Sequence, residues 1–208
     1  MRLVQNQTGK GRYHVLHVST KEALDAIRRA KAEGLNVTCE AAPHHFTLTE
    51  EAVGDYKTFA KVNPPLRDEE SRKAIYDGIC DGTIDAIATD HAPHDEESKR
   101  LPLADAAFGI VGLETMLPLA LALYHNGDID LRALLAKMTY QPANIIGVAA
   151  GRIKKGAKAD LTLIDLDKKW KIKPENFHSK SKNSPFEDFP VQGRAIKTFV
   201  GGRLVYSV

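Results

Sequence analysis

The sequence contains few of the residues that extracellular and membrane proteins rely on. Among 208 residues there are two cysteines, Cys39 and Cys80, and one tryptophan. Two isolated cysteines give neither a disulfide framework nor a Cys-x-x-Cys motif, which is typical of a protein in a reducing cytoplasm. No apolar run approaches the ~20 residues that a membrane helix requires, and the first six residues do not resemble a signal peptide. We therefore expect a cytoplasmic protein with no membrane partner.

An excess of charge of one sign is also missing. Lysine and arginine total 29 against 27 acidic residues, so the formal net charge is +2, and there is no long basic block. A protein that tracks nucleic-acid phosphates usually carries more positive charge, together with aromatic residues among the basic ones. We therefore expect no nucleic-acid partner. The hydrophobic share of 43% is enough to bury a core, which excludes a disordered or collagen-like chain.

Apolar and amphipathic segments alternate through the first 150 residues. The pattern predicts strands at 13–18, 36–42 and 84–88, with helices after the first strand and at 69–80. Ser19 and Glu22 form a capping-box pattern before the first helix, and Gly34 is placed to end it. Polar residues of chemically active types follow each strand. This order predicts an α/β fold, either a β/α barrel or a doubly wound sheet, with function at the carboxyl ends of the strands.

The pattern changes towards the C-terminus. Helices are predicted at 113–123 and 131–138, and Asp130 is placed to cap the second. Further on, residues 159–166, 196–200 and 203–206 alternate as strands, with Gly201-Gly202 as a hairpin turn between the last two. We therefore divide the chain into an α/β part, residues 1–150, and a β part, residues 151–208.

The strongest chemical motif is the segment Ala-Thr-Asp-His-Ala-Pro-His at 88–94. Asp90, His91 and His94 follow an apolar strand directly. Such a turn can direct Asp90 to a metal or a bound water while His94 faces a substrate anion; the alternative is a solvated turn with local caps. His17 ends another predicted strand. Because imidazole and carboxylate suit zinc and similar ions, the two strand ends together predict a metal site open to substrate.

Other loops carry weaker signals. Asn63 precedes two prolines that stiffen its loop, and its amide both donates and accepts hydrogen bonds; an Asx-type turn explains the same spacing equally well. Gly109 could bring bare backbone close to a ligand, although a glycine turn before a helix is the simpler explanation. His44 and His45 adjoin at a strand end. Because neighbouring side chains there diverge, we expect packing and hydrogen bonding of both.

Taken in order, these motifs resemble those of the dihydroorotase family of the amidohydrolase superfamily. The resemblance runs along almost the whole chain, and the segments that carry it are residues 14–20, 39–45, 63–67, 88–94, 108–112, 156–161 and 181–186. The ordered set is specific, although its single members are not. Asn63 and the segment 88–94 favour dihydroorotases over the related hydantoinases.

The resemblance implies a fold and an activity. The fold is the C-terminal part of a (β/α)8 TIM-type barrel in residues 1–150, followed in residues 151–208 by the C-terminal strands of a small composite β-domain. The activity is reversible zinc-dependent hydrolysis and cyclisation between L-dihydroorotate and N-carbamoyl-L-aspartate, in de novo pyrimidine biosynthesis.

The resemblance also assigns roles to residues of this chain. His17 and Asp90 would bind one or two zinc ions, and Asp90 would also be the general acid and base. Asn63, His94 and the backbone of Gly109 would contact the small-molecule substrate.

Part of the family's site has no counterpart here. The His-x-His pair of metal ligands on the family's first barrel strand is missing, so we expect the remaining zinc ligands N-terminal to residue 1. The chain is then the C-terminal portion of a dihydroorotase and is expected to be inactive in isolation. Two other functions stay open, a non-catalytic scaffold for aspartate transcarbamoylase and a related cyclic amidase such as an allantoinase or hydantoinase. The resemblance also allows a homodimer.

Overall fold

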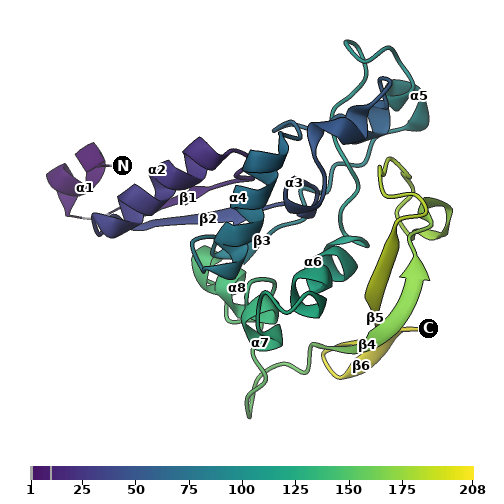
Figure 1. The fold of residues 1–208 in the computed structure, drawn as a ribbon. Helices are drawn as coiled ribbons and strands as arrows, with labels where there is room; N and C mark the ends of the chain where they lie inside the picture. Colours follow the sequence, from purple (N-terminus) through teal and green to yellow (C-terminus); the bar gives the residue numbers. More distant parts are fainter. Residues whose placement is uncertain (1, 10) are drawn as a thin grey trace.

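The computed structural model describes residues 2–9 and 11–208, which form two three-stranded sheets with helices beside and between them (Figure 1). In chain order the elements are α1 (Arg2–Thr8), β1 (Tyr13–Val15), α2 (Lys21–Ala32), β2 (Val37–Ala41), α3 (Pro43–Thr47), η1 (Glu50–Val53), η2 (Thr58–Ala60), α4 (Glu69–Cys80), β3 (Ala86–Ile87), α5 (Glu96–Lys99), α6 (Met116–His125), α7 (Leu131–Ala136), α8 (Tyr140–Ile146), β4 (Leu161–Lys171), η3 (Pro174–Asn176), β5 (Pro190–Val200) and β6 (Arg203–Ser207).

The first sheet is parallel, in the order β1-β2-β3. All three of its strands were predicted, and each is shorter than the apolar segment that predicted it. For the first strand, one reason is His17, which the predicted segment included and which has φ 47°. A left-handed residue cannot continue a strand. The predicted helix at 69–80 is confirmed at both ends as α4.

One face of this sheet is covered by helices. Val37, Cys39 and Ala41 of β2 are buried in a hydrophobic cluster that also contains residues of α2 and α4. Because successive side chains of a strand point to opposite faces, Thr38 and Glu40 lie on the other face. The core therefore fixes which side chains of β2 are free to take part in a polar site.

The start of α2 differs from the predicted capping box. Thr20 is the N-cap, and its hydroxyl accepts a hydrogen bond from the Ala23 amide at 3.2 Å. Ser19 instead accepts a hydrogen bond from the Arg67 guanidinium at 3.3 Å. The prediction was wrong by one residue because Thr20, in extended conformation, is the last residue before the helical turn, and an N-cap residue needs that backbone.

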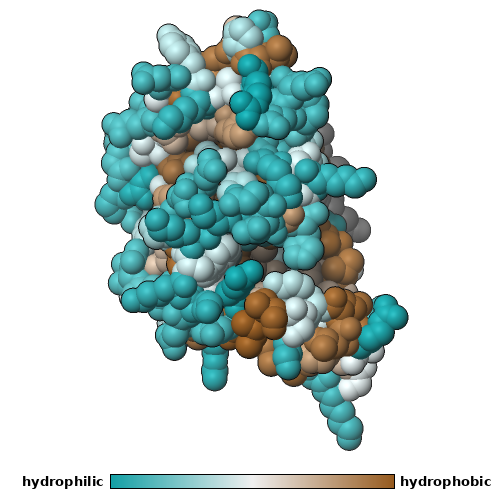
Figure 2. Space-filling view, turned by 90° about the vertical axis from the view of Figure 1, so that its right-hand side faces the viewer, coloured by the Kyte–Doolittle hydropathy of each residue, from teal (hydrophilic) through white to brown (hydrophobic). Residues whose placement is uncertain are grey.

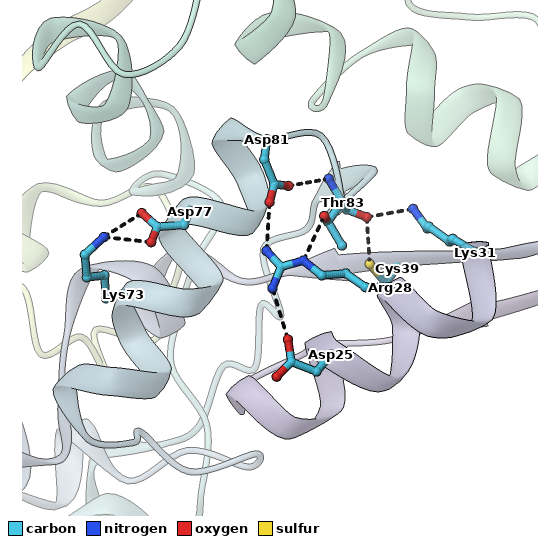
Figure 3. Close-up of polar contacts among 8 residues, drawn as sticks. All are labelled: Asp25, Arg28, Lys31, Cys39, Lys73, Asp77, Asp81 and Thr83. Atoms are coloured by element: carbon cyan, nitrogen blue, oxygen red, sulfur yellow. Dashed lines mark hydrogen bonds and ion pairs between the residues drawn. The ribbon is translucent and has the colours of Figure 1, made fainter. Parts of the chain in front are cut away.

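Polar contacts connect α2 and β2 to residues 81–83, which precede β3 (Figure 3). Arg28 of α2 donates to Asp81 at 2.7 Å and to the Thr83 hydroxyl at 3.3 Å. The Cys39 thiol donates to the Thr83 carbonyl at 3.4 Å, and burial raises the pKa of this thiol to about 11. These contacts fasten α2 and β2 to the turn that leads into β3, and they make Cys39 a protonated core residue.

The second sheet is antiparallel, in the order β4-β5-β6. The predicted turn at Gly201-Gly202 is confirmed, with φ of 56° and 80°. β4 and β5 are longer than predicted, because the pairing resumes beyond a register shift between Asp165 and Lys169. Helix α6 packs against β5 (Figure 1). Gly193 permits this close approach, since a Cβ there would lie 2.3 Å from Leu121 Cδ1.

The outward surface of the second sheet retains apolar side chains. Figure 2 faces this side of the molecule and shows them gathered towards its lower end among hydrophilic residues. The exposed apolar residues of β4, β5, β6 and the C-terminus are Leu161, Leu163, Val200, Leu204, Val205 and Val208. Within residues 2–9 and 11–208, every helix is too short or too polar to cross a bilayer.

The division at residue 150 stays a prediction. Residues 147–160 contain neither helix nor strand and connect α8 to β4. A hydrophobic cluster nevertheless joins the two parts, because Val111 and Leu119 pack with Ile172 and Phe186.

The N-cap of α7 provides a test of local helix stability. The Asp130 carboxylate accepts hydrogen bonds from the amides of Arg132 at 2.9 Å and Ala133 at 3.3 Å. Asp130→Ala leaves both amides without this acceptor and is expected to lower the free energy of unfolding by about 1 kcal/mol, measured by urea denaturation. Asp130→Asn keeps an acceptor and serves as the matched control. Equal stability of the two variants would contradict the assignment.

Candidate functional site at the carboxyl ends of the parallel strands

Three strand ends converge on one carboxylate. The Asp90 side chain follows β3, and its Oδ1 atom lies 3.4 Å from Nε2 of His17, which follows β1. Its Oδ2 atom lies 3.8 Å from Nε2 of His44, which follows β2. Carboxyl ends of parallel strands meet at one edge of a sheet, which is where α/β proteins place their ligand sites. The structure thus brings the predicted residues His17 and Asp90 together and adds His44.

The backbone at this edge is held in an uncommon conformation. His17 and Asp90 both have φ 47°, in the left-handed region that costs a non-glycine residue about 1 kcal/mol. Such residues persist only where the surrounding structure fixes them, and they concentrate at functional sites. His17 lies two residues after the end of β1 and Asp90 three residues after the end of β3, so the left-handed turn helps set the direction of the imidazole and the carboxylate.

Glu40 of β2 contacts both His14 and His17 and was not predicted as a site residue. Its Oε1 atom is 3.0 Å from His17 Nδ1, and its Oε2 atom is 3.1 Å from His14 Nε2. Burial opposes ionisation of Glu40, but the contacts with His17 and His14 outweigh it and lower the pKa of Glu40. The hydrogen bond that the His17 ring donates to Glu40 raises the pKa of His17. With its Nδ1 directed at Glu40, the His17 ring presents Nε2 to Asp90.

The two adjacent histidines of α3 have different surroundings. Nε2 of His45 is 2.9 Å from the Pro64 carbonyl oxygen, so the predicted hydrogen bond is confirmed for this residue. His44 packs as predicted, with 1% of its surface exposed, but its Nε2 atom has no hydrogen-bond partner among the described residues, so the predicted hydrogen bond is not found at this atom. Burial lowers the pKa of His44 well below its ordinary value. His44 therefore presents a neutral, unsatisfied nitrogen towards Asp90.

His94 and Gly109 form a second group. A Cβ built on Gly109 would lie 2.8 Å from both Nε2 and Cδ2 of His94, and Gly109 has φ 144°. Asn183 joins the two segments: its side chain donates to the Ala92 carbonyl at 2.9 Å and the Gly109 carbonyl at 3.0 Å, and it accepts from the His94 amide at 3.2 Å. Only glycine permits this contact with the His94 ring.

Asn63 stands apart from the other predicted site residues. It is exposed in the loop between η2 and α4, and within the described residues no hydrogen bond joins it to His17, Asp90, His94 or Gly109. The loop is fastened to the site indirectly, through the contact of His45 with Pro64. The amide of Asn63 is therefore available to a ligand, and its predicted role is neither supported nor opposed by a contact.

The side chains at the strand ends fit part of a zinc site. Imidazole nitrogen and carboxylate oxygen are common zinc ligands, and a catalytic zinc usually takes three protein ligands. His17 Nε2 and Asp90 Oδ1 are 3.4 Å apart and point at one another. In the part of the chain that the structure describes, no group of three or more histidine, cysteine, aspartate or glutamate side chains is placed to hold a metal ion. Two such side chains are fewer than the ligands that a catalytic zinc usually takes.

The predicted site residues do not line the hollow beside the second sheet. That cavity, of about 660 Å³, is lined by residues such as Trp170, His178 and Arg194, and by none of the predicted site residues. His94 instead lines a separate hollow of about 540 Å³ together with Asn183 and Arg100, and small ligands usually bind in such clefts.

Comparison with known proteins relates this geometry to a family. Residues 2–205 match the amidohydrolase family. Dihydroorotases of Wolbachia sp. subsp. Brugia malayi (strain TRS) and Ehrlichia canis (strain Jake) are 62% and 56% identical to the chain over 195 residues, which make up 94% of this chain and 44% of each relative. The chain thus spans less than half the length of these curated relatives.

Solved structures show the same relationship at lower identity. The L-hydantoinase (dihydropyrimidinase) from Arthrobacter aurescens has a TM-score of 0.90 at 33% identity, covering 99% of this chain and 47% of that one. The D-hydantoinase (dihydropyrimidinase) from Thermus sp. has a TM-score of 0.87 at 27% identity, covering 99% of this chain and 46% of that one. The fold described here therefore recurs in cyclic amidases.

The contact between Gly109 and His94 can be tested by adding one methyl group. Gly109→Ala places a Cβ against the His94 ring at a strained φ, so we expect displaced His94 ring resonances in NMR spectra and a loss of more than about 1 kcal/mol in stability. Gly127→Ala is the control, because Gly127 has φ 82° with nothing within 4 Å of its Cβ. Unchanged His94 resonances in Gly109→Ala would contradict the contact.

The buried His45 predicts a dependence of stability on pH. Burial lowers the pKa of His45 to about 4, whereas an unfolded chain protonates histidine near pH 6.5. Between these values the unfolded state binds a proton that the folded state does not, so the free energy of unfolding decreases as the pH falls through this window. We expect His45→Gln to reduce the slope in urea denaturation, whereas the exposed control His178→Gln keeps it. Equal slopes for wild type and His45→Gln would refute the prediction.

Proposed function

Because the chain belongs to the amidohydrolase family, we propose that it supplies the carboxyl-terminal half of a dihydroorotase active site. The observation that carries the proposal is the approach of His17 Nε2 to Asp90 Oδ1 at 3.4 Å in a chain that is 62% identical to a dihydroorotase over 195 residues. The reaction proposed is the reversible conversion of L-dihydroorotate to N-carbamoyl-L-aspartate in pyrimidine biosynthesis, in the cytoplasm.

The fold proposed for the complete protein is a (β/α)8 barrel with a small composite β-domain. The parallel order β1-β2-β3, with α2 following β1 and α4 following β2 on the same face, agrees with three consecutive barrel units. The antiparallel sheet β4-β5-β6 would belong to the β-domain. Residues 1–150 and 151–208 are the proposed shares of the chain in these two parts.

His17 and Asp90 are proposed to hold zinc, one or two ions in all. The remaining ligands would come from protein that corresponds to the part of the relatives outside this chain. When bound, zinc polarises an amide carbonyl and lowers the pKa of a bound water. Glu40, at 3.0 Å from His17 Nδ1, would fix the orientation of that imidazole, as a carboxylate behind a metal-binding histidine commonly does.

Asp90 is proposed to move the proton. In the hydrolytic direction, its carboxylate accepts a proton from the attacking water as the new C–O bond forms. It then delivers this proton to the ring nitrogen as the C–N bond breaks, which is ordinary general acid–base catalysis. The reverse sequence closes the ring. The position of Asp90 just after β3 gives its carboxylate access to the edge where substrate would lie.

The remaining predicted residues are proposed to bind the substrate. His94 and the Asn63 amide would hold the carboxylate and the polar groups of the ring, and the Gly109 backbone would contact the ring face. The contact between Gly109 and His94 and the bonds that Asn183 makes to their segments support a common role for the pair.

Activity requires the rest of the site, so the test uses a full-length chimaera. The part of the Wolbachia dihydroorotase outside the region matched by this chain is joined to the chain, and turnover of L-dihydroorotate is assayed together with the zinc content. We expect an active chimaera, an inactive isolated chain and a loss of kcat of roughly a thousandfold in Asp90→Asn. Asp167→Asn, an exposed aspartate of β4, is the matched control and should keep full activity.

The outcomes separate the competing functions. Full activity of Asp90→Asn would refute the role of Asp90, and turnover of hydantoin but not dihydroorotate would assign the chain to the hydantoinases. An inactive, zinc-free chimaera that co-purifies with aspartate transcarbamoylase would favour the scaffold function instead.

A further inference from the structure

Lys99, at the end of α5, is completely buried, with 0% of its surface exposed. Lysine is rarely buried unless its charge is compensated. Its Nζ atom donates to three backbone carbonyl oxygens: Lys61 at 3.1 Å, Ala107 at 2.9 Å and Gly109 at 3.0 Å. An ammonium group has three N–H donors, so three carbonyls use all of them. A neutral apolar side chain at this position would supply none of these donors, and the Ala107 carbonyl would then have no hydrogen-bond partner among the described residues.

These carbonyls belong to segments that the proposed function uses. Lys61 lies two residues before Asn63, Gly109 is itself a proposed substrate contact, and Lys99 follows His94 by five residues. The Gly109 amide also donates to the Lys61 carbonyl at 2.9 Å. One ammonium group therefore lies where the Asn63 loop, the His94 turn and the Gly109 loop meet.

We propose that Lys99 is a positioning residue that clamps these three segments together and so fixes the geometry of substrate binding. The proposal rests on the proposed function for its substrate, L-dihydroorotate. Lys99 does not reach the reacting atoms itself, because its donors are taken up by the backbone behind the site.

The segment that Lys99 holds has little regular structure of its own. Between α5 and α6, residues 100–115 contain no helix and no strand beyond a single bridge from Ile110 to His91. Lys61 supports the same segment, because its ammonium donates to the carbonyls of Leu103, Ala104 and Ala106. Backbone carbonyls without ladder partners need other donors, and here two lysines provide them.

The charge of Lys99 is retained at neutral pH. Burial, reinforced by the positive charge of Lys61, lowers the pKa of Lys99 to about 8. The group is then mostly protonated at pH 7. In the described residues the Ala107 carbonyl has no other hydrogen bond, whereas the Gly109 carbonyl also accepts from Asn183. Removal of the ammonium therefore takes the one described partner from the Ala107 carbonyl and one of two donors from the Gly109 carbonyl.

The first test measures local opening in the 208-residue chain itself. Lys99→Met removes the donors and keeps an unbranched side chain. The matched control is Lys137→Met, because Lys137 is 5% exposed and donates to the Ile84 carbonyl, ahead of β3 and away from the site. Amide hydrogen exchange is compared at Gly109 and at Val18, whose amide donates to Glu40. We expect Lys99→Met to speed exchange at Gly109 at least tenfold more than at Val18.

The second test uses steady-state kinetics of the full-length chimaera with L-dihydroorotate. We expect Lys99→Met to raise KM about tenfold with kcat nearly unchanged, because substrate contacts are loosened while Asp90 is untouched. Lys137→Met should lower the melting temperature and leave both constants unchanged. If Lys99→Met does not fold, Lys99→Gln, which keeps an amide donor, replaces it in both tests.

The results distinguish failure of this proposal from failure of the proposed function. Equal acceleration of exchange at Gly109 and Val18 in Lys99→Met overturns the clamp, as does an unchanged KM or a loss confined to kcat. A chimaera without activity on dihydroorotate, combined with selective exchange at Gly109, overturns the proposed function and supports the clamp.

Discussion

The backbone hydrogen bonds that pair β1 with β2 and β2 with β3 in parallel determine where the chemistry of this chain can lie. Parallel pairing brings all three carboxyl ends to one edge, so His17, His44 and Asp90 meet there although up to 73 residues separate them along the chain. An antiparallel arrangement would place them at opposite edges. The left-handed residues just beyond β1 and β3 then turn the functional side chains towards one another.

The two faces of β2 have different roles, one in stability and one in the polar site. Cys39 and neighbours on its face are buried against α2 and α4, which contributes the hydrophobic stabilisation of the sheet. Glu40 points the other way, to His14 and His17. A strand that packs well on one face can thus carry a charged side chain on the other. At the same edge, the buried Nε2 atom of His44 has no hydrogen-bond partner among the described residues.

The loops around the edge depend on side chains for their shape. Asn183 and Lys99 both bond to the Gly109 carbonyl, and His45 bonds to the Pro64 carbonyl. Each of these contacts satisfies a carbonyl oxygen that no strand pairs. Irregular segments gain order in this way without regular secondary structure. Gly109 and His94, the proposed substrate contacts, lie against one another in such segments.

The sequence by itself determined the elements whose signals are local. Helix α4, the Asp130 cap and the turn at Gly201-Gly202 depend on residues a few positions apart, and all three were predicted correctly. The motif order also predicted the family. The predicted cap at Ser19 was one residue off, because N-cap choice depends on the backbone leaving the strand.

Only the tertiary structure decided which distant groups share a site. Glu40 is a partner of His17 through strand register, and Asn183 reaches Gly109 across 74 residues. Lys99 reads in the sequence as one more charged residue after an acidic run, yet the fold buries it completely among carbonyl oxygens. Hydrogen bonds between distant segments leave no periodicity in a sequence, because they are set by how sheets and loops pack in three dimensions.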